Sequence, residues 1–315
     1  MLLIGAVAFL VTAAVALFIP WLPDQVSRER EGIDLTFWLA TWICIGIFAV
    51  VAAVIGYSFL KFRVRPDDDS DGPPIHGHTG LEIAWTAVPF LLVIVLGVTS
   101  AVVLSQNGKA RGANPNEINV TAEQFAWSFE HPNGVTDGTL RIPVGRSTVL
   151  TLHARDVIHS FWVPEFGQKQ DAVPGTETRL VITPKRTGTF PVICTELCGL
   201  GHSLMRSRVI VMPENAYAQW LQQGEASEPA SGEAIFTDAG CAGCHTFASA
   251  GATGKVGPDL EMLPDDPEFV RTSIVDPDAE ITPGYQGGVM PKTFGDQLSA
   301  EQLDTLVQYL LGGSE

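Results

Sequence analysis

A run of twelve residues in the middle of the chain concentrates side chains that bind metals. It reads Cys-Thr-Glu-Leu-Cys-Gly-Leu-Gly-His-Ser-Leu-Met, and its potential donors are Cys194, Glu196, Cys198, His202 and Met205. Thiolates are soft ligands and imidazole is intermediate, a combination that suits copper. Two cysteines four residues apart on a loop can each bridge two metal ions, and a methionine sulfur can add a weak, long bond. A second imidazole must come from another segment, and the candidate is His159, 35 residues before Cys194 at a predicted strand end.

Zinc is the alternative metal for such a site. A Cys2His2 set binds zinc in a closed tetrahedral site that supports folding rather than electron transfer. The spacing here is Cys-x3-Cys-x3-His with a methionine three residues further on, which is not the usual zinc spacing. The sequence therefore favours copper over zinc, and so dense a cluster is not the pattern of cysteines and histidines scattered through a core.

A second metal signature lies downstream at Cys241-Ala-Gly-Cys244-His245, the C-x-x-C-H pattern of covalent c-type haem attachment. The two thiols hold the haem and the histidine ligates its iron. The alternatives are a zinc ribbon, which needs a second cysteine pair, and a thioredoxin-like site, which needs a βαβ context. No cysteine follows Cys244 and no βαβ pattern surrounds it, so the prediction is haem c. Two different redox centres on one chain indicate electron transfer.

The sixth haem ligand is expected to be a methionine, because Met/His ligation raises the haem potential and suits a donor to copper. Only Met262 and Met290 lie downstream of the motif. Met290 precedes a proline that stiffens its loop and lies 45 residues beyond His245, which leaves room to wrap a haem. Met262 lies only 17 residues beyond His245 and is expected to fill a gap near the ring. Met290 is therefore the predicted iron ligand.

Apolar stretches open the chain, at residues 2–19, 35–60 and 83–104. The second and third are long enough to cross ~30 Å of hydrocarbon, so we expect a transmembrane hairpin over residues 33–106. The first stretch leaves two interpretations open. Ala14-Val-Ala16 resembles a signal cleavage site, but no Lys or Arg precedes it. Residues 1–22 are accordingly expected to be either a signal sequence or an extra transmembrane helix.

The rest of the chain divides into a β-rich part and a helical part. Short apolar and β-branched runs separated by Gly and Pro predict about eight strands over residues 107–221, as in a sandwich or small barrel. Residues 222–230 are polar and carry Pro and Ser, which predicts a linker. Residues 231–315 end in a helical period with a capping box at its start, formed by Ser299 and Gln302. The predicted fold class is a multi-domain membrane protein with transmembrane helices, an all-β domain and an all-α domain.

The chain is strongly acidic, with a formal net charge of -16 and a sequence pI of about 4.7. Such a chain is unsuited to nucleic acid, whose phosphates need a basic surface. The charge favours a basic partner protein, although general solubility alone would also explain it. Four of the five cysteines lie in the two metal motifs, so no disulfide framework is predicted. The fifth, Cys44, is expected to be a small buried apolar residue.

These motifs resemble subunit II of the haem–copper cytochrome c oxidases. The likeness covers residues from about 33 to 213. It runs from Asp156 through His159 and Asp171-Ala-Val-Pro-Gly175 to Cys194–Met205, and Leu81–Pro89 resembles the family's second spanning helix. The family carries a binuclear copper centre, CuA, in a cupredoxin domain. Residues 230–313 resemble in turn a small class I cytochrome c.

The resemblance implies roles for individual residues. The side-chain ligands of CuA would be His159, Cys194, Cys198, His202 and Met205. Glu196 would ligate copper through its backbone carbonyl, while its carboxylate reaches a magnesium ion shared with subunit I. Glu82 matches the family's glutamate at the entrance to a proton pathway. From the sequence alone, a glutamate at a helix start is a favourable N-terminal charge.

One aromatic segment departs from the family's pattern. The family's Gln-Trp-x-Trp, whose first Trp takes electrons from soluble cytochrome c, is here Gln124-Phe125-Ala126-Trp127. Phe125 and Trp127 are the candidate electron-transfer aromatics. With Phe125 in the place of the first Trp, entry from a free, docked cytochrome through that ring is in doubt. A tethered haem domain would offer a different entry route.

The resulting prediction is the electron-entry subunit of a respiratory terminal oxidase in a prokaryotic plasma membrane. Haem c is attached outside the cytoplasm, so both metal domains are expected on the outer side. Electrons would pass from an upstream cytochrome or cytochrome complex through haem c to CuA. From there they would reach subunit I, where O2 is reduced to water with proton translocation. No acid–base or nucleophilic catalytic set is expected in this chain.

A CuA-containing subunit of a nitric oxide reductase is the alternative that the sequence leaves open. A nitrous oxide reductase would have neither spanning helices nor a fused cytochrome. A quinol oxidase subunit would lack the pair Cys194 and Cys198, and a copper-delivery or storage protein would not need haem c. The expected partners are subunit I, the other oxidase subunits, the upstream donor and membrane lipid.

Overall fold

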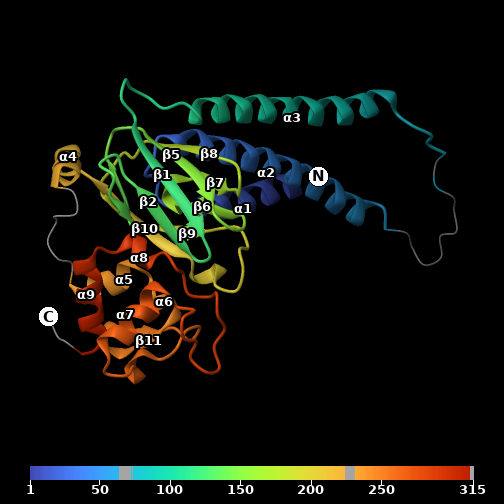
Figure 1. Cartoon of the computed structure of the whole chain (residues 1–315). Coiled ribbons are helices and arrows are strands. Elements are labelled where there is room, and N and C mark those ends of the chain that lie inside the picture. Colours follow the sequence, from blue (N-terminus) through green and yellow to red (C-terminus); the bar gives the residue numbers. More distant parts are fainter. Residues whose placement is uncertain (64–71, 73, 224–230, 313–315) are drawn as a thin grey trace. The chain divides into compact units, whose positions relative to one another are not determined.

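The computed structural model describes residues 1–63, 72, 74–223 and 231–312 (Figure 1). The predicted linker, residues 222–230, lies almost wholly outside these ranges. The chain forms two compact units. One consists of Met1–Asp24 with Glu31–Asn107, and the other of Gln25–Arg30 with Gly108–Glu315.

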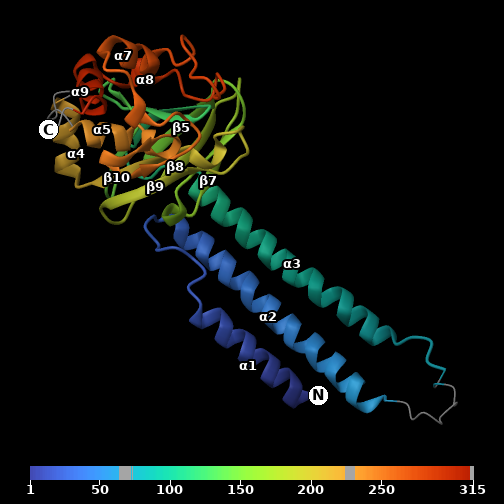
Figure 2. The same ribbon diagram turned by 90° about the horizontal axis from the view of Figure 1, so that it is seen from below.

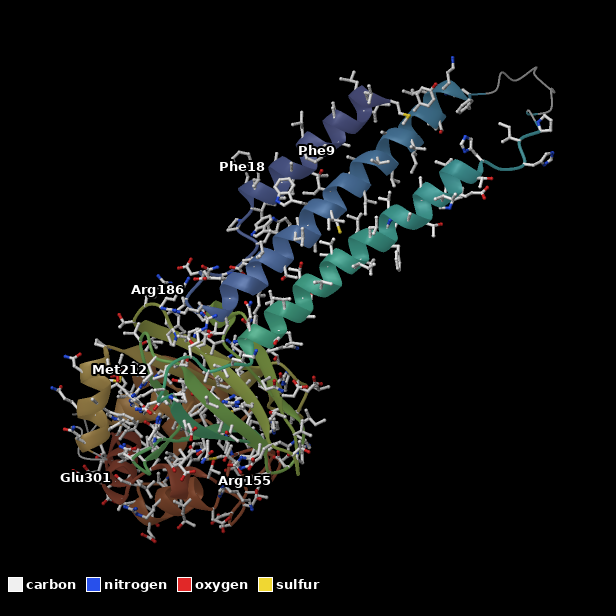
Figure 3. The ribbon with its side chains drawn as sticks, turned by 90° about the horizontal axis from the view of Figure 1, so that it is seen from above. Phe9, Phe18, Arg155, Arg186, Met212 and Glu301 are labelled. Atoms are coloured by element: carbon white, nitrogen blue, oxygen red, sulfur yellow. The ribbon has the colours of Figure 1, made fainter. Side chains whose placement is uncertain are left out.

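The first unit is built from apolar helices, α1 (Leu2–Phe18), α2 (Glu29–Lys61) and α3 (Thr79–Asn107). α2 has 33 residues and α3 has 29, and both are long and apolar enough to cross a membrane, whereas α1 has 17. α1 runs alongside α2 (Figures 2 and 3). Small residues allow this approach: a Cβ on Gly5 would stand 3.1 Å from Ala53 Cβ, and one on Gly56 would stand 3.1 Å from Ile4 Cγ2.

Cys44 lies on α2 and is exposed, so the expectation that it is buried is wrong. The physical reason is the nature of the helix. A helix that is hydrophobic on every side can face lipid as well as protein. An apolar stretch in the sequence therefore does not show that its small residues are buried within the chain.

The second unit contains a β-sandwich of two five-stranded sheets, in the orders β3-β2-β1-β5-β8 and β4-β10-β9-β6-β7. Within residues 108–223 the strands thus number ten rather than about eight. The difference lies in short strands such as β3, whose two residues are too few to show an alternating pattern. The strands are β1 (Asn116–Glu123), β2 (Ala126–Glu130), β3 (Thr136–Asp137), β4 (Leu140–Pro143), β5 (Thr148–Ala154), β6 (His159–Trp162), β7 (Lys169–Ala172), β8 (Thr178–Ile182), β9 (Gly188–Cys194) and β10 (Arg206–Met212).

Aromatic rings fill the space between the two sheets. Trp127 and Phe129, from β2 of one sheet, meet Phe161, from β6 of the other, with their rings edge-on at 5.6 and 6.3 Å. All three side chains are almost completely buried. Edge-to-face pairs of this kind add to the stabilisation that the buried area provides. This packing holds β6 in place, and His159 is the first residue of β6.

A segment outside the predicted domains also belongs to the sandwich. Residues 25–30, just before and at the start of α2, pack on the loops 164–167 and 183–185. Ser27 is fully buried and its hydroxyl donates to the carbonyl of Phe166 at 2.9 Å. The backbone N–H of Thr183 donates to the Glu29 carboxylate at 2.8 Å. These six residues therefore belong to the unit that contains the β-sandwich, although their sequence carries no strand pattern.

Helix α4 (Glu214–Gln223) covers one edge of the sandwich. Tyr217 donates its hydroxyl hydrogen to Asn116 Oδ1 at 2.9 Å. Trp220 lies edge-on against the buried imidazole of His131, with ring centroids 4.7 Å apart. The guanidinium carbon of Arg141 lies over the Trp220 ring, 5.3 Å from its centroid. Burial lowers the pKa of His131 to about 4, so this imidazole is neutral at physiological pH.

The C-terminal part is a small helical domain. Its helices are α5 (Gly232–Asp238), α6 (Cys241–Cys244), α7 (Pro267–Val275), α8 (Phe294–Gln297) and α9 (Ala300–Leu310), with a short hairpin of β11 (Thr246–Phe247) and β12 (Ala252–Thr253). The predicted capping box of Ser299 and Gln302 is present at the start of α9. α5 and α9 cross closely at Gly232, where a Cβ would fall 2.1 Å from Tyr309 Cβ.

We predict that the stability of the sandwich falls as the pH drops from about 6.5 towards 4. In the unfolded chain His131 takes up a proton near its ordinary pKa of 6.5, whereas in the folded chain it does so only near 4. Neutral His131 therefore makes its full contribution to the free energy of unfolding above pH 6.5. This contribution, at most about 3 kcal/mol, is lost as the pH falls from 6.5 towards 4. Urea unfolding at pH 7 and pH 5 measures the change, and His131→Phe should remove most of it. An equal pH dependence in this variant would contradict the assignment.

Candidate metal centres

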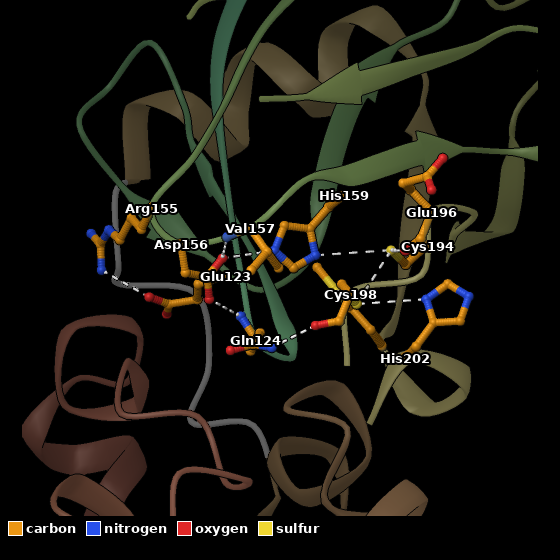
Figure 4. A network of polar contacts seen from close by, with 11 residues as sticks. Glu123, Gln124, Arg155, Asp156, Val157, His159, Cys194, Glu196, Cys198 and His202 are labelled. Atoms are coloured by element: carbon orange, nitrogen blue, oxygen red, sulfur yellow. Dashed lines mark hydrogen bonds and ion pairs between the residues drawn. The ribbon is translucent and has the colours of Figure 1, made fainter. Parts of the chain in front are cut away.

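The predicted copper ligands come from three neighbouring places in the sandwich (Figure 4). β9 ends at Cys194, the loop after it carries Cys198 and His202, and β10 begins directly after Met205. His159 opens β6, which pairs with β9 so that Phe161 lies opposite Cys194. The antiparallel pairing therefore brings His159 beside the cysteine loop, although 35 residues separate them.

The two thiols and two imidazoles converge in the structure. Cys194 Sγ lies 3.9 Å from His159 Nδ1 and 3.9 Å from Cys198 Sγ. Cys198 Sγ lies 3.5 Å from His202 Nδ1. The ligand atoms of His159, Cys194 and Cys198 all fall within 4.8 Å of one another, and all three side chains are buried. The predicted His, Cys, Cys and His set thus forms one cluster.

The remaining predicted donors each lie close to one of the two cysteine sulfurs. Met205 is fully buried, with its sulfur 3.9 Å from Cys198 Sγ. The backbone carbonyl of Glu196 lies 3.4 Å from Cys194 Sγ. The Glu196 carboxylate points outward from the sulfur atoms and is exposed (Figure 4). One residue therefore presents a carbonyl to the cluster and a carboxylate to its surroundings.

The two thiols differ in their protonation. Burial raises the pKa of Cys194, but hydrogen bonds with His159 and with backbone groups outweigh burial and lower the pKa to about 7. Burial together with the neighbouring Cys194 raises the pKa of Cys198 to about 12. One thiolate therefore forms readily and the second does not, because like charges this close repel. Metal cations at this place would supply the charge that releases the second proton.

The candidate aromatic residues both lie close to this cluster. Trp127 is a core residue, 2% exposed, with its ring 6.3 Å from that of His159. Phe125 lies against the cysteine loop: a Cβ on Gly201 would fall 2.5 Å from Phe125 Cδ2. Both aromatic rings therefore contact the parts of the sandwich that carry the predicted copper ligands.

Glu82 lies in the other unit, in the first turn of α3, where its carboxylate accepts the backbone N–H of His78 at 3.2 Å. This contact fits the structural interpretation, in which Glu82 is a favourable charge at a helix N-terminus. A role in proton transfer stays a prediction.

The haem motif lies on α6 in the helical domain. His245 is 8% exposed, and its Nδ1–H donates to the Pro258 carbonyl at 2.8 Å. This hydrogen bond fixes the tautomer and leaves Nε2 available for iron, as is usual for a metal-ligating histidine. Gly257 makes room for the ring, because a Cβ there would fall 2.5 Å from His245 Cε1. The local backbone therefore orients the predicted iron ligand.

Met290 lines the same cavity as Cys241, Cys244 and His245. The cavity wall in this domain is mostly apolar and includes Phe236, Leu260, Leu263, Ile274, Phe294 and Leu306. Met262 is 82% exposed, so the expectation that it fills a gap near the haem is wrong. It ends a short 3-10 turn (Leu260–Met262) that turns its side chain to solvent.

The loop that carries Met290 is held by a carboxylate that sequence inspection missed. Asp278 Oδ1 accepts the backbone N–H of Gly288 at 2.8 Å, and Asp278 Oδ2 lies 2.7 Å from Lys292 Nζ. These contacts lie two residues before and two residues after Met290. The sequence did not predict this role of Asp278, because no motif around it indicates a contact with a loop ten residues further on.

Both predicted cofactors fit the residues present. Two thiols, two imidazoles and a thioether are a donor set suited to copper. An apolar cavity with two free thiols and a histidine is suited to a covalently attached haem. Together with apolar helices that can cross a membrane, these centres define a membrane-anchored electron-transfer protein with a cupredoxin-like domain and a c-type cytochrome domain.

The comparisons with known proteins are consistent along the whole chain. Residues 12–103 match the transmembrane domain of cytochrome c oxidase subunit II, residues 119–212 match its periplasmic domain, and residues 229–314 match cytochrome c. The chain belongs to the cytochrome c oxidase subunit II family and is an oxidase subunit. The family implies CuA copper, and the cytochrome c domain implies haem.

Two relatives show how far the similarity extends. Cytochrome c oxidase subunit 2 of Alkalihalophilus pseudofirmus is 34% identical over 91% of this chain and 87% of its own length. Cytochrome c oxidase subunit 2 of Bacillus subtilis is 28% identical over 99% of this chain and 96% of its own. The solved periplasmic domain of subunit II of cytochrome oxidase from Bradyrhizobium japonicum is 28% identical, covering 38% of this chain and 98% of that one, with a TM-score of 0.35.

Cys198→Ser is expected to abolish the mixed-valence signal of a binuclear copper centre while haem c stays attached. The thiol of Cys198 lies between Cys194, His202 and Met205, so an alcohol there removes the shared sulfur. Electron paramagnetic resonance measures the copper signal and the pyridine haemochrome spectrum measures haem. Cys44→Ser, on α2, is the matched control and should leave both unchanged. A binuclear spectrum retained in Cys198→Ser would refute the assignment.

Met290→Ala is expected to remove the absorption band of a thioether bound to ferric haem, with the haem still covalently attached. Met262→Ala should leave that band intact, because its side chain is exposed. Optical spectra of the two oxidised variants give the comparison. An unchanged band in Met290→Ala would show that another group is the sixth ligand.

Proposed function

We propose that this chain is the electron-entry subunit of a respiratory terminal oxidase. It would relay single electrons from an upstream donor through haem c to CuA and on to subunit I, where O2 is reduced to water with proton translocation. The observation that carries the proposal is the convergence of His159, Cys194, Cys198, His202 and Met205 in one buried cluster, on a chain that also has a haem-attachment motif.

The chain's own residues would support this relay by holding the ligands and excluding water. CuA, when bound, supplies a centre that gains and loses one electron. His159 and Met205 are fully buried, and the two cysteines are nearly so. Ligands held by the walls of a sandwich move little when the charge of a centre changes, which keeps the cost of each transfer low. Burial and hydrogen bonds to the ligands are also what tune a potential.

Electron entry would use the fused cytochrome domain rather than a free cytochrome docked on a tryptophan. The support is Phe125, which stands where the family has Trp and packs against the cysteine loop. A tethered donor is present at an effective concentration that a soluble one does not reach. The net negative charge of the chain would then favour a basic upstream cytochrome or cytochrome complex.

Three further roles belong to the same proposal. The outward carboxylate of Glu196 would reach a magnesium ion at the boundary with subunit I, since its backbone carbonyl already faces Cys194. Glu82 would stand at the entrance of a proton pathway. The complex would lie in a prokaryotic plasma membrane with both metal domains on the outer side, where haem c is attached.

The decisive experiment measures oxygen uptake by the purified complex with ascorbate and a small mediator, and tests NO as a competing substrate. We expect O2 reduction at turnover rates of order 10 to 10³ per second and negligible NO consumption. The complex carrying Cys198→Ser should keep a reducible haem c but lose nearly all O2 uptake. Dominant NO turnover would leave the metal assignments intact and move the chain to the nitric oxide reductase alternative.

A further inference from the structure

The copper cluster is part of a closed ring of polar contacts (Figure 4). From His159 the ring passes through Cys194 to Cys198 by the sulfur contacts described above. It then leaves the cluster through the backbone carbonyl of Cys198, continues through Gln124 and Asp156, and returns to His159. The two residues that close the ring, Gln124 and Asp156, are not ligands.

Gln124 contacts both ligand-bearing loops at once. Its backbone N–H donates to Asp156 Oδ2 at 2.7 Å. Its side-chain Nε2–H donates to the backbone carbonyl of Cys198. The partners are 32 and 74 residues away in the sequence, so a single residue after β1 ties the loop before β6 to the loop after β9.

Asp156 carries this connection to the imidazole. Its Oδ1 lies 2.9 Å from His159 Nε2 and also accepts the backbone N–H of Val157 at 2.6 Å. With Nε2 held by the carboxylate, Nδ1 of His159 faces Cys194. A carboxylate in this position fixes the tautomer and orientation of a ligating histidine. Asp156 thus uses one oxygen for Gln124 and the other for His159.

The cysteine loop is shaped to receive these groups. A Cβ on Gly199 would fall 2.6 Å from Gln124 Nε2, and one on Gly201 would meet the Phe125 ring. Two glycines therefore let Gln124 and Phe125 approach the backbone on both sides of Leu200. The Gln124 amide packs against the backbone at Gly199, so a side chain at position 199 would displace it.

We propose that Gln124 is a positioning residue that fixes the separation of the two ligand loops, through its side chain to Cys198 and through Asp156 to His159. The inference rests on the proposed function, because the readouts in the loaded protein need copper bound by these ligands. The constraint itself belongs to the protein. The Cys198 carbonyl is anchored, so the thiol of Cys198 keeps its place relative to Cys194 and His159 when the charge at the centre changes.

The sharpest test is Gln124→Glu in the full chain. Glutamate has the same length and shape, so the contacts with Gly199 and Phe125 remain, but its carboxylate cannot donate to the Cys198 carbonyl. The variant loses a hydrogen bond and places two oxygens opposite each other, which should raise the population of open loop conformations about tenfold. In the metal-free chain, we expect amide hydrogen exchange over residues 196–201 to accelerate by about that factor while β1 and β5 are unchanged.

The copper-loaded chain gives a second, independent readout. The hyperfine pattern and near-infrared band of the mixed-valence centre should shift in Gln124→Glu, and copper loss to a chelator should be about tenfold faster. Gln168→Glu is the matched control. The Gln168 amide donates to the Val181 carbonyl at 2.8 Å, the same kind of contact at another place in the sandwich. This control should leave the copper spectrum unchanged.

Two kinds of result would overturn the inference, and a third would overturn only the proposed function. Wild-type exchange and spectra in Gln124→Glu would show that the amide does not position the loop. Equal changes in Gln124→Glu and Gln168→Glu, or faster exchange throughout the sandwich, would show general destabilisation instead. If the wild-type chain bound no binuclear copper, the proposed function would fail, while exchange in the metal-free chain would still decide the role of Gln124.

Discussion

The antiparallel pairing of β6 with β9 is the interaction on which the copper site depends. It sets Phe161 opposite Cys194, and by the same register places His159 beside the loop that holds the cysteines. This pairing is held in turn from the other sheet, where Trp127 and Phe129 pack edge-on against Phe161. A shift of one residue would turn every side chain of β6 to the opposite face and remove the histidine from the cluster. The core of the sandwich is therefore also the frame of the metal site.

The closeness of two buried thiols, with their sulfurs 3.9 Å apart, is a second constraint on the cluster. Hydrogen bonds with His159 and with backbone groups outweigh burial and lower the pKa of Cys194 to about 7, whereas burial and the neighbouring Cys194 raise the pKa of Cys198 to about 12. The same closeness that would let each sulfur bridge two metals therefore makes the unloaded pair hold a proton. Metal uptake and proton release are linked at this site, so copper affinity must increase with pH as long as the thiols carry the proton.

The sequence allowed the fold class and both metal motifs to be predicted, because each motif is local and its residue types are chemically distinctive. The structure brings the candidate copper ligands together, and their roles as ligands stay predictions. Met290, predicted as the iron ligand from the stiffness of its loop, lines the same cavity as the haem motif, and its role as a ligand stays a prediction. The expectations for Met262 and Cys44 were wrong, because exposure is decided by packing rather than by neighbours in the chain. Gln124, Asp278 and the segment 25–30 were missed for a common reason. Their partners are distant in the sequence or are backbone groups, which no residue type reveals. Gln124 donates to a backbone carbonyl 74 residues further along the chain, and Ser27 donates to one 139 residues further along.

The predicted copper and haem sites restrain their loops and histidines by the same kinds of hydrogen bond. In each, a predicted ligand lies on a loop that regular secondary structure does not hold, and a polar side chain from another segment contacts the backbone of that loop. Gln124 does so for Cys198, and Asp278 does so for Met290 through Gly288. In each, a histidine is oriented by an acceptor on its second nitrogen, Asp156 for His159 and the Pro258 carbonyl for His245. Because one-electron transfer is fastest when ligands do not move, restraints of this kind matter as much to a relay as the ligands themselves.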